Sequence, residues 1–231
     1  RKNNNEALAK FLSQSWGLCK LMRPKQWVKN GFVLAPLMFS GEFMDLEAVS
    51  RAMFAMFLFC VASSAVYIIN DIHDIENDRR HPRKSKTRPL AAGIISIPAA
   101  LTLLAVLYTV LVLSWFIAPK VMLVIIAYSV LNLAYTFKLK YLPVIDIFVI
   151  AIGFVLRVYA GAMAVGAPVS SWMFITTLCL ALYLASVKRQ QELKQSGSEG
   201  RKTLEKYTVA LVDRYAEMSA TGALLFYSMF E

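Results

Sequence analysis

Three aspartates lie close together where a long apolar segment ends. Asp71, Asp74 and Asp78 are spaced i, i+3, i+7, so a helix that continues out of this segment would place them on one face. Three neighbouring carboxylates repel one another unless a cation neutralises them. Mg²⁺ suits the set because it takes carboxylate oxygens, keeps waters and bridges to substrate phosphates. The spacing predicts a magnesium site, and a solvated acidic loop is the alternative interpretation.

A run of cations follows the aspartates directly. Its members are Arg79, Arg80, Arg83, Lys84, Lys86 and Arg88. Metal ligands next to cations are what a diphosphate-bearing substrate requires, because together they offset the charge of the substrate and of the leaving group. A basic loop that only sets membrane orientation is the alternative. His73 and His81 are expected to form hydrogen bonds in the loop rather than to bind metal.

Further polar residues are expected at the same membrane face. These are Arg23–Asn30, in which Lys29 and Asn30 lie deeper, and Tyr135, Lys140, Lys188, Arg189 and Glu192, each with anchoring at the membrane surface as the alternative role. Asp146 and Arg157 lie inside one apolar segment, about 16 Å apart along a helix, and cannot pair directly. Intramembrane charges usually face a bundle interior or a cavity. Arg157 is therefore a candidate for binding the phosphate of a lipid substrate, and a structural role is equally open.

The composition indicates an integral membrane protein. Of 231 residues, 58% are hydrophobic and 17% charged, whereas soluble domains are about half apolar and a quarter charged. The net charge of +10 lies in short loops between apolar segments, which favours a membrane over nucleic acid as the partner. The three cysteines are scattered without metal or disulfide spacing. Because the chain ends inside an apolar run, we expect further spans beyond it.

Seven segments are predicted to cross the membrane, within a single domain that covers residues 1–231. They are Trp27–Phe43, Ala52–Asn70, Ile97–Ile117, Val121–Phe137, Pro143–Ala164, Ser171–Val187 and Thr208–Phe230. Residues 5–22 are predicted to form an amphipathic helix on the membrane surface. Lys and Arg are concentrated in the N-terminal arm and in alternate loops, and the opposite side has only Arg51 and Lys120. This asymmetry predicts that the N-terminus and the basic loops are cytoplasmic.

The motif Asn70-Asp71-x-x-Asp74-x-x-x-Asp78, followed by Arg88-Pro89 and Gly93, resembles the first Asp-rich motif of the UbiA superfamily of intramembrane prenyltransferases. The resemblance covers essentially the whole chain. It implies an all-helical bundle with nine spans around a central cavity and a catalytic cap on the cytoplasmic side, so that about two C-terminal spans would follow the seven predicted here. It also implies location in the inner, or plasma, membrane.

The sequence departs from ordinary UbiA enzymes at the second Asp-rich motif. Those enzymes have carboxylates in the sixth–seventh loop, where this chain has Lys188-Arg189-Gln190-Gln191-Glu192. In this respect the chain is similar to the decaprenyl-phosphate phosphoribosyltransferase branch. The strings that agree with that branch are Arg23–Asn30, His81-Pro82-x-Lys84, Tyr135 with Lys140, Pro143–Asp146, Gly153-Phe154-x-x-Arg157 and Lys188-Arg189-x-x-Glu192.

This resemblance implies Mg²⁺-dependent transfer of 5-phosphoribose from phosphoribosyl diphosphate to a polyprenyl phosphate, with release of diphosphate, in the synthesis of cell-envelope glycan precursors. Asp71, Asp74 and Asp78 would hold the metal on the donor. The residues implied for donor and diphosphate binding are Asn70, Lys29, Lys84, Arg88, Lys188, Arg189 and Glu192, with Lys188 and Arg189 on the 5-phosphate. Arg157 and Lys25 are implied for the lipid phosphate. Tyr135 and Lys140 would position the donor or the acceptor.

Two other functions remain open. A UbiA-type prenyltransferase would move a polyprenyl group from its diphosphate to an aromatic acceptor, and the missing second Asp-rich motif favours a sugar donor instead. A transporter could use Asp146 and Arg157 along a pathway, but the chain shows no clear internal repeat and the aspartates lie at the membrane face. The oligomeric state is also open, because helix faces rich in Ala and Gly pack within bundles or between subunits.

Overall fold

The computed structural model describes residues 13–142, 145–168, 171–196 and 208–229, and all regular structure within them is helical. Residues 13–21 form a first helix. The elements that follow are η1 (Pro24–Leu34), α2 (Ala35–Phe39), η2 (Glu42–Met44), α3 (Leu46–His73), α4 (Ile75–Arg80), α5 (Lys84–Thr87), α6 (Ile97–Ser114), α7 (Pro119–Phe137), η3 (Leu139–Tyr141), α8 (Ile145–Val165), α9 (Ser171–Ser196) and α10 (Val209–Ser228). The predicted all-helical fold is confirmed.

Five helices are long and apolar enough to cross a membrane. They are α3, α6, α7, α8 and residues 171–191 of α9, and each overlaps a predicted span. Outward-facing apolar side chains such as Leu101, Val106 and Leu113 on α6 are exposed in the isolated chain. In a bilayer this surface faces lipid, so the chain is an integral membrane protein.

The other two predicted spans are not confirmed. The segment predicted as Trp27–Phe43 is a 3₁₀ helix followed by one short α-helix, because Pro36 and Gly41 interrupt the chain before a long helix can form. Helix α10 has sufficient length, but Asp213, Arg214 and Glu217 interrupt its apolar character. Of the predicted surface helix, residues 13–21 are helical, and residues 5–12 lie outside the described part of the chain.

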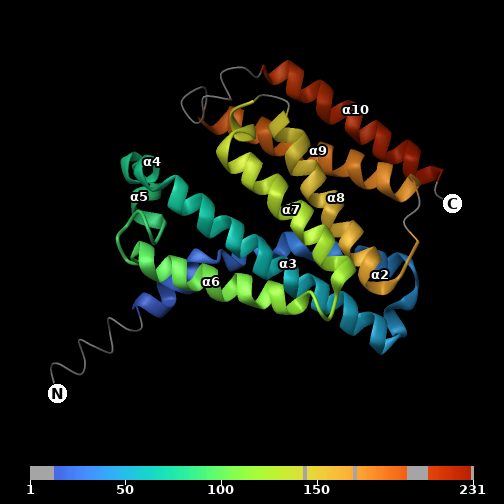
Figure 1. The fold of residues 1–231 in the computed structure, drawn as a ribbon. Helices are drawn as coiled ribbons and strands as arrows, with labels where there is room; N and C mark the ends of the chain where they lie inside the picture. Colours follow the sequence, from blue (N-terminus) through green and yellow to red (C-terminus); the bar gives the residue numbers. More distant parts are fainter. Residues whose placement is uncertain (1–12, 143–144, 169–170, 197–207, 230–231) are drawn as a thin grey trace.

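Helix α3 is the centre of the bundle and packs against η1, α6, α7 and α8. Residues 58–66, in the middle of this helix, are all buried, and Leu58, Phe59 and Ala62 belong to the main core. Figure 1 shows α4 and α5 at one end of the bundle, together with the end of α7 and the start of α10. The predicted polar residues from separate apolar segments are therefore brought to one end.

The unusual 3₁₀ segment η1 lies directly against α8. A Cβ atom at Gly161 would come within 1.9 Å of the backbone oxygen of Val33, so only glycine allows this approach. The contact fixes η1 beside α8 and places Asn30, which is fully buried, next to Arg157. Asn30 of this segment thus reaches the interior of the bundle.

Candidate functional site

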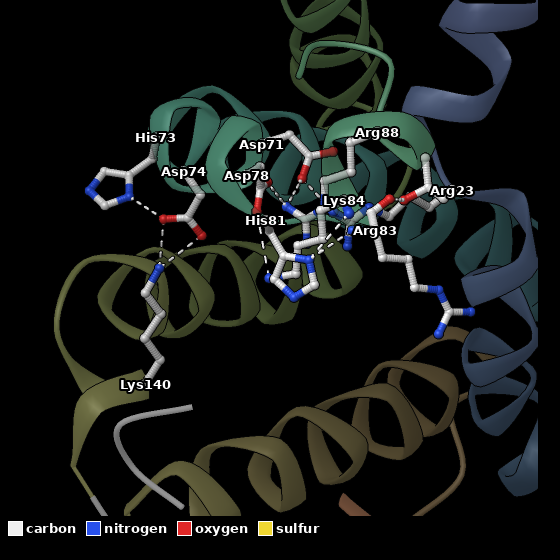
Figure 2. Close-up of polar contacts among 11 residues, drawn as sticks. Arg23, Asp71, His73, Asp74, Asp78, His81, Arg83, Lys84, Arg88 and Lys140 are labelled. Carbon is white, nitrogen blue, oxygen red and sulfur yellow. Dashed lines mark hydrogen bonds and ion pairs between the residues drawn. The ribbon is translucent and has the colours of Figure 1, made fainter. Parts of the chain in front are cut away.

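Asp71 and Asp78 form a compact cluster with three cations at the end of the bundle. Arg88 Nη1 donates to Asp71 Oδ1 at 2.8 Å and also to Asp78 Oδ2. Arg23 forms an ion pair with Asp71, and Lys84 Nζ lies 3.6 Å from Asp78 Oδ1. Figure 2 shows these side chains converging from η1, α3, α4 and the segment that contains α5. Both carboxylates are buried, so the cations supply the charge compensation that burial requires.

The prediction that the three aspartates face one way is wrong. Helix α3 ends at His73 and α4 begins at Ile75, with Asp74 in a non-helical conformation between them (φ −93°, ψ 8°). Because Asp74 departs from helical geometry, the three aspartates do not lie on one continuous helix, and their spacing does not place them on one face. Asp71 and Asp78 share Arg88, whereas Asp74 points toward Lys140, as Figure 2 shows.

Asp74 and Lys140 form a nearly buried ion pair that connects two parts of the bundle. Lys140 Nζ lies 2.8 and 2.9 Å from the two carboxylate oxygens, and the side chains are 8% and 16% exposed. The His73 ring also lies 2.9 Å from Asp74. Burial acts to raise the pKa of Asp74, but the hydrogen bonds from Lys140 and His73 outweigh it and hold this pKa below its usual range. The pair therefore fastens η3 to the break between α3 and α4.

The substitution Asp74→Asn is expected to destabilise the folded protein by about 2 kcal/mol at neutral pH, because a charged hydrogen-bond acceptor is lost. The pKa of Asp74 is lower in the folded than in the unfolded chain, so its stabilising effect is full above about pH 4 and is lost as the pH falls through the folded-state value. Thermal unfolding in detergent should therefore separate the two proteins at pH 7 and bring them together in acid. Glu47→Gln, at an exposed carboxylate, is the matched control. An equal difference at both pH values would contradict this role.

A cavity of about 580 Å³ opens beside the Asp71–Asp78 cluster. It lies within the size range of small-molecule sites. Seven cationic side chains line it, namely Arg23, Lys29, Lys84, Arg88, Arg157, Lys188 and Arg189. Asp71, Asp78 and Asp146 contact some of these cations, but no carboxylate lies among the lining residues described. The cavity is therefore suited to a ligand with several negative charges.

The structure brings together most, but not all, of the predicted site residues. Asn70, Tyr135, Lys29, Lys84, Arg88, Arg157, Lys188 and Arg189 all line the cavity. Lys25 is exposed, and neither it nor Lys140 is among the lining residues, so the predicted phosphate contact of Lys25 finds no support in this arrangement. The side chain of Glu192 lies outside the described part of the structure.

Arg157 is a buried cation whose described partners are all neutral. Its Nε donates to Asn30 Oδ1 at 2.8 Å, its Nη1 to the Gly153 carbonyl at 2.7 Å and its Nη2 to the Tyr128 hydroxyl at 3.1 Å. The guanidinium also lies over the rings of Tyr128 and Phe154. The residue is only 5% exposed, yet it lines the cavity. A buried charge without an opposite charge is costly, so this position favours an anionic ligand.

The sequence analysis missed several residues of the cavity. Tyr128 and Asn132 lie on the face of α7 that also presents Tyr135, at positions i, i+4 and i+7 of one apolar helix. This spacing is visible in the sequence and would have identified Tyr128 and Asn132 as candidates. Arg23 was not singled out, and its role depends on a left-handed backbone conformation (φ 54°), which is uncommon for a residue other than glycine. No local sequence pattern predicts that conformation.

Asp71 and Asp78 form a donor set that fits a magnesium ion. One nitrogen, Arg88 Nη1, contacts oxygens from both carboxylates, so the two side chains are close enough for a single cation to bridge them. Mg²⁺ is commonly bound through one or two carboxylates, with waters and substrate phosphates completing its shell. Among the described residues no group of three acidic, His or Cys side chains is placed to hold a metal ion. The fit therefore rests on two aspartates and a phosphorylated ligand.

Comparison with known proteins gives consistent matches. Residues 32–229 match the UbiA prenyltransferase family. The chain is 37% identical to decaprenyl-phosphate phosphoribosyltransferase of Mycolicibacterium smegmatis over 221 residues, which cover 92% of this chain and 69% of the relative. The protein of the same name from Mycobacterium tuberculosis is also 37% identical, over 92% of this chain and 73% of the relative.

Solved structures share the fold at lower identity. A digeranylgeranylglyceryl phosphate synthase superposes with a TM-score of 0.72 at 22% identity, over 92% of this chain and 76% of that one. A UbiA homolog from Archaeoglobus fulgidus, solved with GPP and Mg²⁺, has a TM-score of 0.68 at 21% identity, over 91% of this chain and 75% of that one.

Proposed function

This chain belongs to the UbiA prenyltransferase family, and from this premise we propose that it transfers 5-phosphoribose from phosphoribosyl diphosphate to a polyprenyl phosphate. The observation that carries the proposal is the cavity lined by seven cations, with Asp71 and Asp78 beside it. A donor with a diphosphate and a 5-phosphate, together with a lipid phosphate, brings the negative charge that such a cavity requires. The relatives named decaprenyl-phosphate phosphoribosyltransferase support the same reaction.

The donor diphosphate is assigned to the wall formed by Arg23, Lys84 and Arg88. The described contacts of Arg88 with carboxylates use Nη1, so Nε and Nη2 are left to donate to phosphate oxygens. Asp71 and Asp78 would hold Mg²⁺ here. The metal would supply positive charge to the diphosphate as it leaves. Asn70 and Lys29 line the same cavity and would add a polar contact and a positive charge to it.

The acceptor phosphate is assigned to Arg157, because that guanidinium has only neutral partners within the described residues. Its position on a membrane-spanning helix suits a substrate that enters from the bilayer. Tyr128 and Asn30 hold the guanidinium in place. Tyr135 and Lys188 line the cavity and would orient the sugar and its 5-phosphate.

The reaction forms one bond and breaks one. An oxygen of the lipid phosphate attacks the anomeric carbon, the bond from this carbon to the diphosphate oxygen breaks, and diphosphate leaves with the bonding electrons. The attacking phosphate is already an anion, so no strong general base is required. The residues of this chain therefore act by binding, orientation and charge stabilisation.

The basic end of the bundle is proposed to face the cytoplasm, with the chain in the inner membrane. The support is the concentration of Lys and Arg in the N-terminal arm and in alternate loops of the sequence. A soluble, charged donor would then reach the cavity from the cytoplasm, and the lipid acceptor would reach it from the bilayer.

The purified protein is expected to convert labelled phosphoribosyl diphosphate and a polyprenyl phosphate into a labelled lipid in the presence of Mg²⁺, with one diphosphate released per lipid formed. Chelation of the metal with EDTA should stop the reaction. A parallel reaction contains a polyprenyl diphosphate and an aromatic acceptor. Prenyl transfer there, without a labelled phosphoribosyl lipid in the first reaction, would reject the proposal and favour a prenyltransferase.

A further inference from the structure

A further buried ion pair joins α8 to α9. Arg189 Nη2 on α9 lies 2.7 Å from Asp146 Oδ2 in the first turn of α8. The side chains are 2% and 0% exposed, and Arg189 is among the largest fully buried side chains of the protein. Ile147 and Val212, from α8 and α10, form the apolar cluster at this junction. The pair therefore lies where three helices meet.

Stability alone is a weak reason for such a pair. Removing two charges from water costs several kcal/mol for each ion, and well-packed apolar residues of similar size often give equal or higher stability. The start of α8 offsets part of the cost for Asp146, because a helix N-terminus favours a negative charge. A further reason lies in the position of Arg189, which lines the cavity.

Arg189 and Lys188 are two adjacent cations that differ in their surroundings. Lys188 is exposed, and its ammonium group sits at the end of a flexible four-carbon side chain. Arg189 is buried and forms an ion pair with Asp146. A guanidinium held at one edge by a carboxylate keeps its planar fork in one orientation and can grip a phosphate with two parallel hydrogen bonds. Lys188 would contribute positive charge, and Arg189 would contribute hydrogen-bond donors in a fixed orientation.

We infer that Asp146 is a positioning residue that orients the Arg189 guanidinium toward the 5-phosphate of the donor, and so sets selectivity for a sugar with a terminal phosphate. The inference rests on the proposed function. The two cation groups of the cavity come from different elements, with Arg23, Lys84 and Arg88 on one wall and Lys188 and Arg189 on α9. The proposed donor has a diphosphate on its anomeric carbon and a phosphate on its 5-carbon, so each cation group would bind one end of the ribose. Asp146 acts through Arg189 and touches no substrate.

The test compares two donors in two proteins. Phosphoribosyl diphosphate is compared with ribofuranosyl 1-diphosphate, which lacks the 5-phosphate, in the wild type and in Asp146→Asn. The substitution is expected to lower kcat/KM for phosphoribosyl diphosphate by about 10- to 100-fold, as loss of an oriented charged hydrogen bond implies. The value for the truncated donor should change by less than about threefold, because that donor makes no use of Arg189. Asp213→Asn is the matched control, since that carboxylate contacts the adjacent Gln190.

Asp146→Glu keeps the experiment decisive if the Asn variant does not fold. The longer carboxylate retains the charge but displaces the guanidinium, so a smaller loss confined to phosphoribosyl diphosphate is expected. An equal loss with both donors, or no loss in the Glu variant, would overturn the inference while leaving the proposed reaction intact. Absence of transfer by the wild type with phosphoribosyl diphosphate would instead reject the proposed function itself.

Discussion

Replacing Arg157 by glutamine is expected to lower kcat/KM for the polyprenyl phosphate by at least about 30-fold, because truncating one partner of a desolvated charge pair costs roughly 2–5 kcal/mol. The KM for phosphoribosyl diphosphate should stay close to the wild-type value. The guanidinium is buried, lines the cavity and has only neutral partners among the described residues. Its unmatched charge is therefore available to the acceptor phosphate.

Two further variants separate binding from folding. Arg157→Lys retains the charge but cannot contact Asn30, Gly153 and Tyr128 together, so we expect a partial loss with the same dependence on the acceptor. Arg214→Gln removes an exposed arginine on α10 and should leave the kinetics unchanged. Steady-state kinetics with each substrate varied in turn, together with unfolding temperatures, provide the measurement. A rise in the donor KM with an unchanged acceptor KM would reassign Arg157 to the donor.

Asp78→Asn is expected to change diphosphate binding in opposite directions with and without metal. Asp78 pairs with Arg88 and Lys84, so without Mg²⁺ its carboxylate competes with diphosphate for these two cations. The variant should then bind diphosphate about threefold more tightly, as expected from freeing two partly exposed ion pairs. With Mg²⁺ present the variant should bind diphosphate more weakly, because one of the two carboxylate ligands is lost. Transfer should fall by at least about 100-fold, in line with the several kcal/mol that a catalytic metal supplies.

Binding measurements distinguish this role from simple structural support. Calorimetric titration of diphosphate with and without Mg²⁺, and Mn²⁺ binding followed by EPR, report on the site without turnover. Glu76→Gln, at an exposed carboxylate of the same short helix, is the control and should alter neither quantity. Weaker diphosphate binding by Asp78→Asn under both conditions would mean that the carboxylate only supports the local fold.

The two ion-pair systems at the basic end have different roles. Asp74 and Lys140 lie apart from the cavity lining and fasten η3 to the break after α3. Asp71 and Asp78 lie beside the cavity, and Arg88, which pairs with both carboxylates, is one of its lining residues. A conservative change at Asp74 is accordingly predicted to alter stability, whereas one at Asp78 is predicted to alter ligand binding. The sequence motif groups the three residues, but their partners separate them.

The membrane-spanning helices, the basic face and several candidate site residues could be predicted from short-range patterns in the amino-acid sequence. Long apolar segments predicted α3, α6, α7, α8 and α9. A segment that crosses lipid must form its backbone hydrogen bonds internally, as a helix does, and its lipid-facing side chains must be apolar. The concentration of polar residues at segment ends predicted one basic face. Lys29, Lys84 and Arg157 were identified as candidates from residue type and position alone, and all three line the cavity.

The pairing of charged and polar side chains from distant parts of the chain depends on how the helices pack. Asp74 pairs with a lysine 66 positions away, and Arg157 bonds to Asn30 across 127 positions, so no local spacing could specify these contacts. The chain break at Asp74 and the close approach of η1 to Gly161 also arise from packing between helices. Spacing along one helix predicts which residues share a face. Partner choice depends on the helix packed opposite, and only the assembled bundle supplies that information.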